Sequence, residues 1–328
     1  MTIYVVPCGV SLLDALEDPA SKRRPPRWKA KPFGDRRDDW TGKTLLASGH
    51  EHRIDDDQVI GSWTESGLAD PMLCEWTSMV SAETHTLAKR TGLPMEPVAA
   101  LRAVLDRNDR VVLLASDTGK GITAALCVAF VITGGDVRRM HFISTPSSEA
   151  EVATFAGRLH PRKVTVVRVT GLGPSDGGLR TAVAGIGRVL RCVYDLQERL
   201  EIHLTGGFKA TLLHTLAMSE VVHSLSPATK TEGPNGGGPI DWTTAWYLFD
   251  DEDASPVQIG LRRFSTGSIN NMRAELSAAA RKKLPDRSCA FENIAWEVQG
   301  TEAVLNDFGV GYLAVLGPKD HRTNDGAP

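Results

Sequence analysis

The 328-residue sequence has few cysteines, no long hydrophobic run and no excess of positive charge. Its five cysteines are widely spaced and form no CxxC pair, which argues against a zinc knuckle or a disulfide framework. The most apolar run, residues 122–133, is too short to span a bilayer. The first residues, MTIYVVPCGV, lack the basic stretch of a secretory signal. We therefore expect a cytoplasmic protein with buried, reduced thiols and no membrane partner.

The formal net charge of −3 argues against a protein that binds duplex DNA, because phosphate contacts normally require a basic surface. A small anionic ligand stays compatible, since backbone amides and a few cations can bind it. No spacing typical of metal ligands is found, and His203 and His214 are interpreted as core residues. We predict neither a metal ion nor another cofactor.

Short runs rich in β-formers alternate with longer runs of helical periodicity. The predicted strands are Ile3–Pro7, Arg110–Ala115, Met140–Ser144, Lys163–Val169, Glu201–Leu204 and Thr244–Phe249. The predicted helices are Glu75–Ala88, Val98–Asp106, Ile122–Ile132, Glu149–Leu159, Gly178–Leu200 and Phe208–Val222. This alternation predicts a Rossmann-like α/β fold, with a mainly parallel sheet and helices on both faces. Ligands bind such sheets at the carboxyl ends of the strands.

The predicted α/β domain covers residues 1–262, and residues 263–328 form a small C-terminal segment with a disordered tail. Within the domain, residues 18–60 are dense in charge and are interpreted as a surface insertion, either a solvated loop or a mobile flap. Residues 224–242 are rich in Gly, Pro and Ser and predict a flexible loop.

Three polar turns follow predicted strands. In PCGVSLLDAL, Gly9 permits a tight turn before Val10, and Ser11 either caps the next helix or contacts a ligand. In LLASDTGKG, the small polar residues either contact a ligand or have a structural role; they are Ser116, Asp117 and Thr118. Neither this turn nor GLGPSDGG matches a phosphate-loop or dinucleotide fingerprint.

The third turn, IHLTGGFKATLL, gives the clearest signal. Thr205, Gly206 and Gly207 end a strand, and Phe208 and Lys209 begin a helix. Two glycines free the backbone, the helix amino terminus offers unpaired N–H groups, and the lysine adds a positive charge. A phosphate group fits these features. Separately, Arg180 follows GLGPSDGG and either reaches a phosphate or is a surface arginine.

The GVSLL, SDT and TGGFKA turns together resemble those of the CARF family, the CRISPR-associated Rossmann-fold sensors of type III defence systems. SAETHTLAKR, VTGLGPSDGGLRTAVAGI and TTAWYLFDDED are similar to other segments of that family, so the resemblance covers residues 1–262. Where the family often has threonine, this chain has Val10.

The resemblance implies a homodimer that binds a cyclic oligoadenylate across its two-fold axis. The Arg-x(4–6)-His motif of the common ribonuclease effector is absent, and so is Glu-x-Lys. A stand-alone ring nuclease is therefore expected, in which Ser11 and Lys209 are the catalytic residues. The other residues of the three turns, with Arg180, would bind the ring, with tetra-adenylate favoured over hexa-adenylate. Two alternatives stay open: a non-catalytic sensor that acts through residues 263–328, and an unrelated Rossmann-like nucleotide enzyme.

Overall fold

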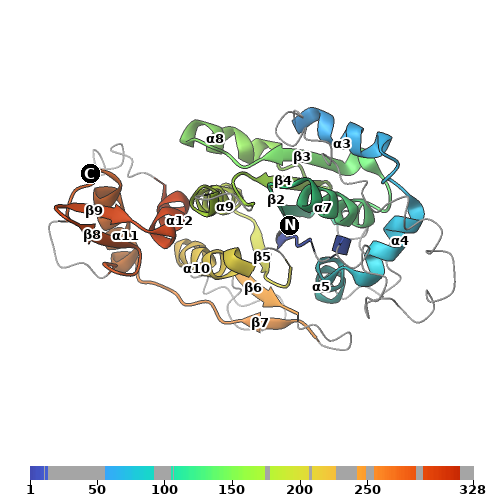
Figure 1. Cartoon of the computed structure of the whole chain (residues 1–328). Helices are drawn as coiled ribbons and strands as arrows, with labels where there is room; N and C mark the ends of the chain where they lie inside the picture. Colours follow the sequence, from blue (N-terminus) through green and yellow to red (C-terminus); the bar gives the residue numbers. More distant parts are fainter. Residues whose placement is uncertain are drawn as a thin grey trace, which may run out of the picture.

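Most strands of the molecule form one sheet. The computed structural model describes residues 1–10, 12–13, 56–91, 105, 107–173, 178–206, 209–226, 242–248, 255–285 and 291–317. The sheet has seven strands in the order β3-β4-β2-β1-β5-β6-β7 (Figure 1). Their bounds are β1 Thr2–Pro7, β2 Arg110–Ser116, β3 Met140–Ser144, β4 Val164–Val169, β5 Arg199–His203, β6 Thr243–Tyr247 and β7 Val257–Ile259. β1 to β6 run parallel, and β7 pairs antiparallel with β6.

The central strands are apolar on both faces, as strands buried on two sides must be. In β2, Val111, Val112, Leu113 and Ala115 are fully buried and Leu114 nearly so. β1 aligns with β2 from Ile3 opposite Arg110 to Pro7 opposite Leu114. The sheet therefore divides the core into two layers, one on each face.

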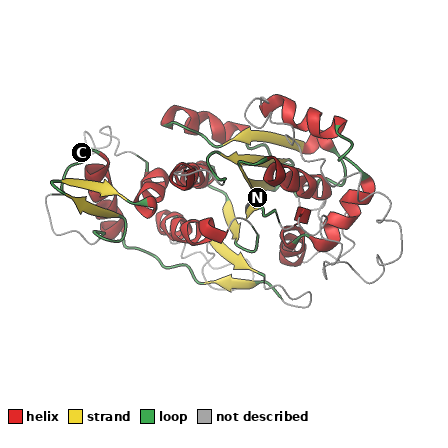
Figure 2. Ribbon diagram, in the orientation of Figure 1, coloured by secondary structure: helices red, strands yellow, loops and turns green. Residues whose placement is uncertain are grey.

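Helices cover both faces of the sheet, as Figure 2 shows. One face packs against α3 Asp56–Glu65, α4 Pro71–Val80, α5 Ala82–Thr91 and α7 Gly119–Ile132. The other face packs against α8 Glu149–Arg158, α9 Gly178–Asp195 and α10 Lys209–Leu225. Every residue of α7 except Lys120 is buried, because α4 covers the side of α7 that the sheet leaves open. The predicted α/β fold, with a mainly parallel sheet and helices on both faces, is confirmed.

The direction of each crossover decides which face its helix covers. Connections that run toward β3, namely β1 to β2 and β2 to β3, place their helices on the first face. Connections that run toward β7 place theirs on the second face, as right-handed crossovers require. Neighbouring strands thus send their helices to opposite faces at two positions, between β1 and β5 and between β2 and β4. Such switch points are where parallel sheets bind ligands.

A C-terminal unit packs against the second layer of helices. It contains α11 Thr266–Ala280, the antiparallel hairpin β8 Trp296–Gln299 with β9 Glu302–Leu305, and α12 Asp307–Leu316. α12 lies between this hairpin and helices α9 and α10 (Figure 1). A Cβ atom on Gly187 of α9 would lie 2.7 Å from the carbonyl oxygen of Gly311, so only glycine permits this helix contact.

Several sequence predictions need correction. The single helix predicted over Glu75–Ala88 is two helices, because Ser81 interrupts it and its Oγ accepts a hydrogen bond from Thr84 N (3.2 Å). The last five residues of the predicted insertion 18–60 begin α3, and residues 224 and 225 end α10. The sequence analysis missed β7 and the β8–β9 hairpin.

Other predictions lie partly or wholly outside the described residues. They concern the rest of the insertion 18–60, most of the helix Val98–Asp106, residues 227–241 of the loop 224–242, and the tail after residue 317.

Burial of the predicted core groups is confirmed where it is described. Cys8, Cys127 and Cys192 are free, buried thiols. His203 is fully buried, and His214 is 9% exposed. None of the helices in the described ranges combines the length and the apolar character that crossing a bilayer requires.

Candidate functional site

The turns that follow β1 and β5 meet at the first switch point. β1 and β5 are paired in parallel, with Val5 opposite Ile202. A Cβ atom on Gly206 would lie 2.7 Å from the carbonyl oxygen of Pro7 and 2.2 Å from Glu83 Oε1. Only glycine therefore fits at this position. We call Gly9, Val10, Thr205 and Gly206 the β1/β5 turn pair.

Glu83 of α5 fixes the backbone of this turn pair. Its side chain is buried, and Oε1 accepts a hydrogen bond from Gly9 N (3.0 Å). Oε2 accepts a second hydrogen bond from Ser81 Oγ (2.8 Å). The carboxylate thus uses the Gly9 amide, so that amide does not face a ligand.

Thr205 is fixed by two further contacts. Its Oγ1 accepts a hydrogen bond from Leu248 N (2.9 Å) and lies 3.1 Å from Thr86 Oγ1 on α5. Lys209 begins α10 and is exposed. The rigid backbone of the turn pair is thus followed by an exposed cation at a helix amino terminus. This combination suits an anion. Ser11, Gly207 and Phe208 lie outside the described residues.

A buried group of charges lies along β5, below this turn pair. Arg90 of α5 donates to both carboxylate oxygens of Glu201 (3.0 Å each) and lies 3.5 Å from the ring centroid of Trp246. Burial alone would raise the pKa of Glu201, but nearby His203, Arg90 and Arg199 outweigh it and lower that pKa. Burial lowers the pKa of His203, although the nearby Glu201 acts in the opposite direction. These groups hold α5 against the sheet.

The thiol of Cys8, next to Gly9, is not an activated nucleophile. Burial, and then the charge of Glu83, raise the pKa of Cys8 well above its usual value. Reactive cysteines need the opposite environment, an exposed site with nearby positive charge. Within the described ranges, moreover, no group of three or more His, Cys, Asp or Glu side chains is arranged to hold a metal ion.

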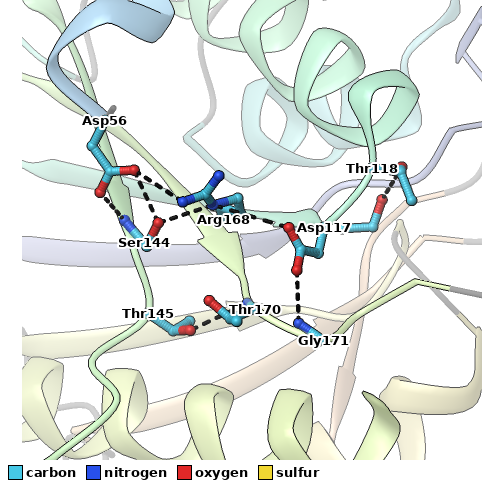
Figure 3. A network of polar contacts seen from close by, with 9 residues as sticks. Asp56, Asp117, Thr118, Ser144, Thr145, Arg168, Thr170 and Gly171 are labelled. Carbon is cyan, nitrogen blue, oxygen red and sulfur yellow. Dashed lines mark hydrogen bonds and ion pairs between the residues drawn. The ribbon is translucent and has the colours of Figure 1, made fainter. Parts of the chain in front are cut away.

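The second switch point carries the predicted SDT turn, and its polar groups bind one another (Figure 3). Asp117 accepts a hydrogen bond from Gly171 N (2.9 Å), and Asp117 N donates to Leu172 O (2.7 Å). Thr118 caps α7 by accepting from Gly121 N (3.0 Å) and lies 3.0 Å from Ser116 Oγ. These contacts favour the structural role for Ser116, Asp117 and Thr118. We call these three residues and Gly171 the β2/β4 turn pair.

Arg168, at the end of β4, connects this turn pair to α3 (Figure 3). Its guanidinium donates to Ser144 Oγ (2.9 Å) and lies 3.4 Å from Asp56 and 4.0 Å from Asp117. Asp56 also accepts hydrogen bonds from the amide (2.7 Å) and hydroxyl (2.9 Å) of Ser144. One cation is shared by two carboxylates, so this network carries a net negative charge.

Arg180 lies at a third place, on the first turn of α9. It donates to Leu305 O (2.8 Å) and lies 4.0 Å from Asp307, with half of its side chain exposed. It lines a cavity at the ends of β3 and β4, away from the β1/β5 turn pair. The structure thus brings the first and third predicted turns together and leaves Arg180 apart from them.

Sequence reasoning missed Glu83, Asp56 and Arg168. Glu83 stands two residues after Ser81, in a pattern that any helix start can show. Arg168 stands in a buried strand whose other residues are four valines and one threonine. A charged residue in a buried strand was the available signal, because such charges are normally paired.

The fold and the β1/β5 turn pair define a doubly wound α/β protein with a glycine-rich, cation-bearing turn at a topological switch point. Compared with protein-family models and with curated proteins, the sequence matches none.

Proposed function

We propose that this chain binds a cyclic oligoadenylate as a cytoplasmic homodimer and opens the ring without a metal ion, which would switch off type III CRISPR signalling. Cyclic tetra-adenylate is favoured over cyclic hexa-adenylate. The observation that carries the proposal is the β1/β5 turn pair. Residues 9–10 and 205–206 are far apart in sequence, yet they meet at a switch point and match the two turns that the CARF resemblance assigns to ligand binding.

The reaction needs little from the protein beyond geometry and charge. The ribose 2′-oxygen forms a bond to the adjacent phosphorus, and the bond from phosphorus to the 5′-oxygen breaks. The 2′-hydroxyl loses its proton and the leaving 5′-oxygen gains one, which yields a linear product with a 2′,3′-cyclic phosphate. Lys209 stabilises the charge on phosphorus-bound oxygen, and Ser11 orients the 2′-hydroxyl or the phosphate. With Glu83 occupied by Gly9 and Ser81, no free general base is assigned, so the reaction should be slow.

A dimer is part of this proposal because a symmetric ring suits a symmetric site. Leu213, one turn after Lys209 on α10, is 68% exposed and offers an apolar contact for a second copy. A Leu213→Glu variant should be monomeric in sedimentation experiments and should lose ring binding. A monomeric wild type in the presence of the ring would contradict the dimer.

The test of the activity is incubation with cyclic tetra-adenylate and cyclic hexa-adenylate in EDTA, with products separated by chromatography. The wild type should form linear products with a 2′,3′-cyclic phosphate, and Lys209→Ala and Ser11→Ala should not. Arg191→Gln, remote from the turn pair on α9, is the matched control. A ring that stays intact with the wild type as well as with the variants would exclude the nuclease activity.

One observation favours a sensor as the second candidate. α10, which begins at Lys209, packs directly against α11 and α12 of the C-terminal unit. A ligand at the β1/β5 turn pair is therefore one helix away from that unit. Rings that raise the melting temperature but stay intact would support this function.

A further inference from the structure

Two adjoining cavities lie along α9, on the side that faces the C-terminal unit. The polar cavity, of about 320 Å³, lies at the ends of β3 and β4; Thr145, Ser147, Thr170, Arg180, Thr181 and Arg188 line it. The apolar cavity, of about 700 Å³, lies between α9, α11 and α12; Ala274, Ala280, Leu305, Leu313 and Ala314 line it. Ala184, Arg188 and Val310 line both cavities, so the two adjoin.

The polar cavity has the chemistry of a phosphate site. Two guanidinium groups and four hydroxyl groups line it, and among the described residues no acidic side chain does so. Arg188 donates to Pro146 O (3.2 Å), while its buried Nε has no hydrogen-bond partner among the described residues. Arginine forks and hydroxyl groups bind phosphate oxygens well.

Some of these polar groups also have partners within the chain. Thr145 Oγ1 accepts from Thr170 N (3.2 Å), and Ser147 bonds the exposed carboxylate of Glu151 (3.0 Å). Arg180 donates to Leu305 O. Arg180 also lies 4.0 Å from Asp307. Neither Glu151 nor Asp307 lines the polar cavity, and each arginine makes one hydrogen bond in these contacts, so guanidinium N–H groups remain for a ligand.

The apolar cavity stays hollow because small side chains line it from three helices. Ala274 and Ala280 are on the exposed side of α11, and Ala314 is on α12. Ser277 also lines it, and its buried hydroxyl has no partner within the described ranges. Glu149 also lines this cavity, where its carboxylate is paired with Arg191. A ligand that fills both cavities needs an anionic head and an apolar body.

We propose that these cavities bind a small, free phosphate monoester with an apolar body. The phosphate lies between Arg180 and Arg188, and the body lies between α9, α11 and α12. This site is separate from the β1/β5 turn pair: the midpoint between β3 and β4 lies three strand spacings away, roughly 14 Å. It also gives the C-terminal unit a function, since α11 and α12 form half of the site.

The test uses octyl phosphate, inorganic phosphate and octanol as probes, each titrated into the protein by calorimetry. Octyl phosphate should bind at least tenfold more tightly than either of the others, because it alone meets both cavities. Arg188→Gln should weaken it at least tenfold. Arg138→Gln, an exposed arginine outside both cavities, should change it no more than twofold. Ala274→Trp, at an exposed helix position, should reduce octyl phosphate to the affinity of inorganic phosphate by filling the apolar cavity.

The proposal is wrong if octyl phosphate binds no more tightly than inorganic phosphate, or if Arg188→Gln and Arg138→Gln behave alike. It is also wrong if vesicles of anionic phospholipid capture the wild type but not Arg188→Gln, because a lipid surface would then be the occupant. Lys209→Ala should bind octyl phosphate as the wild type does. The result is therefore independent of whether cyclic tetra-adenylate binds at all.

Discussion

The β1/β5 and β2/β4 turn pairs occupy equivalent places in the fold, since each lies where neighbouring strands send their helices to opposite faces. Their chemistry differs. At the β2/β4 turn pair, Asp56 and Asp117 share Arg168, so its positive charge is already used within the chain. At the β1/β5 turn pair, the buried carboxylate of Glu83 fixes the backbone, and the side chain of Lys209 is exposed. The topology provides two possible ligand positions, and the side chains fill one of them from within the chain.

The largest expected effect comes from filling the space at Gly206. Gly206→Ala places a methyl group against Pro7 O and Glu83, so it should lower the free energy of unfolding by about 2–3 kcal/mol and abolish ring binding. Urea unfolding measures the first effect. Gly61→Ala on α3 is the control: no atom lies within 4 Å of the added Cβ, and the helix should gain about 0.5–1 kcal/mol. Equal behaviour of both variants would mean that the β1/β5 contact is loose.

Removing the cation of the β2/β4 turn pair should destabilise the fold without affecting the ligand. Arg168→Met leaves two partly buried carboxylates without their partner and should lower the free energy of unfolding by about 1–3 kcal/mol. Arg138→Met removes an ion pair in which the arginine is 87% exposed, and it should leave the free energy of unfolding unchanged. A loss of ring binding in Arg168→Met would show that both turn pairs contact the ligand.

Acid should weaken the layer between α5 and the sheet. The buried His203 has a pKa below its usual 6.5, so below that pH the unfolded chain binds a proton that the folded chain does not. In this window the free energy of unfolding should decrease as the pH decreases, by at most about 1.4 kcal/mol per pH unit for this histidine. His141 and His214 act in the same direction, because burial lowers their pKa values too.

Glu201 adds to this trend at lower pH. Its pKa is lowered from 4.5 in the folded state, so its stabilising contribution is present above that pH and is lost below it. Urea unfolding at about pH 7.5 and about pH 5.5 measures the histidine part. His203→Phe should flatten the dependence in that range. An unchanged slope in this variant would assign the effect to His141 and His214.

The smallest effect concerns the charge at the β1/β5 turn pair. Glu83→Gln keeps an acceptor for Gly9 N and removes a negative charge beside the proposed phosphate. Cyclic tetra-adenylate should therefore bind more tightly, by about 0.5–1 kcal/mol, in calorimetric titration. Glu65→Gln, exposed on α3, serves as the control. Weaker binding by Glu83→Gln would show that the carboxylate itself is required.

The prediction of strands succeeded where burial made the sequence pattern unambiguous. Continuous apolar runs such as β2 located the central strands within a few residues, and β3 coincides with its predicted bounds. The β8–β9 hairpin was missed because its strands are short and half of their residues are exposed, so no long apolar pattern marks them. The helix predicted across Ser81 was divided by a local cap, which competes with helical hydrogen bonding.

The α/β class and the turns with small polar residues follow from the sequence alone, because the alternation of period and the placement of glycine are local properties. Which of these turns lie next to each other depends on the tertiary structure. The strand order places β1 between β2 and β5. The packing of α5 then places Glu83 against Gly9 and Gly206. The pairing of Asp56 with Arg168 joins residues 112 positions apart. Such contacts depend on the packing of whole elements, which no local stretch of sequence encodes.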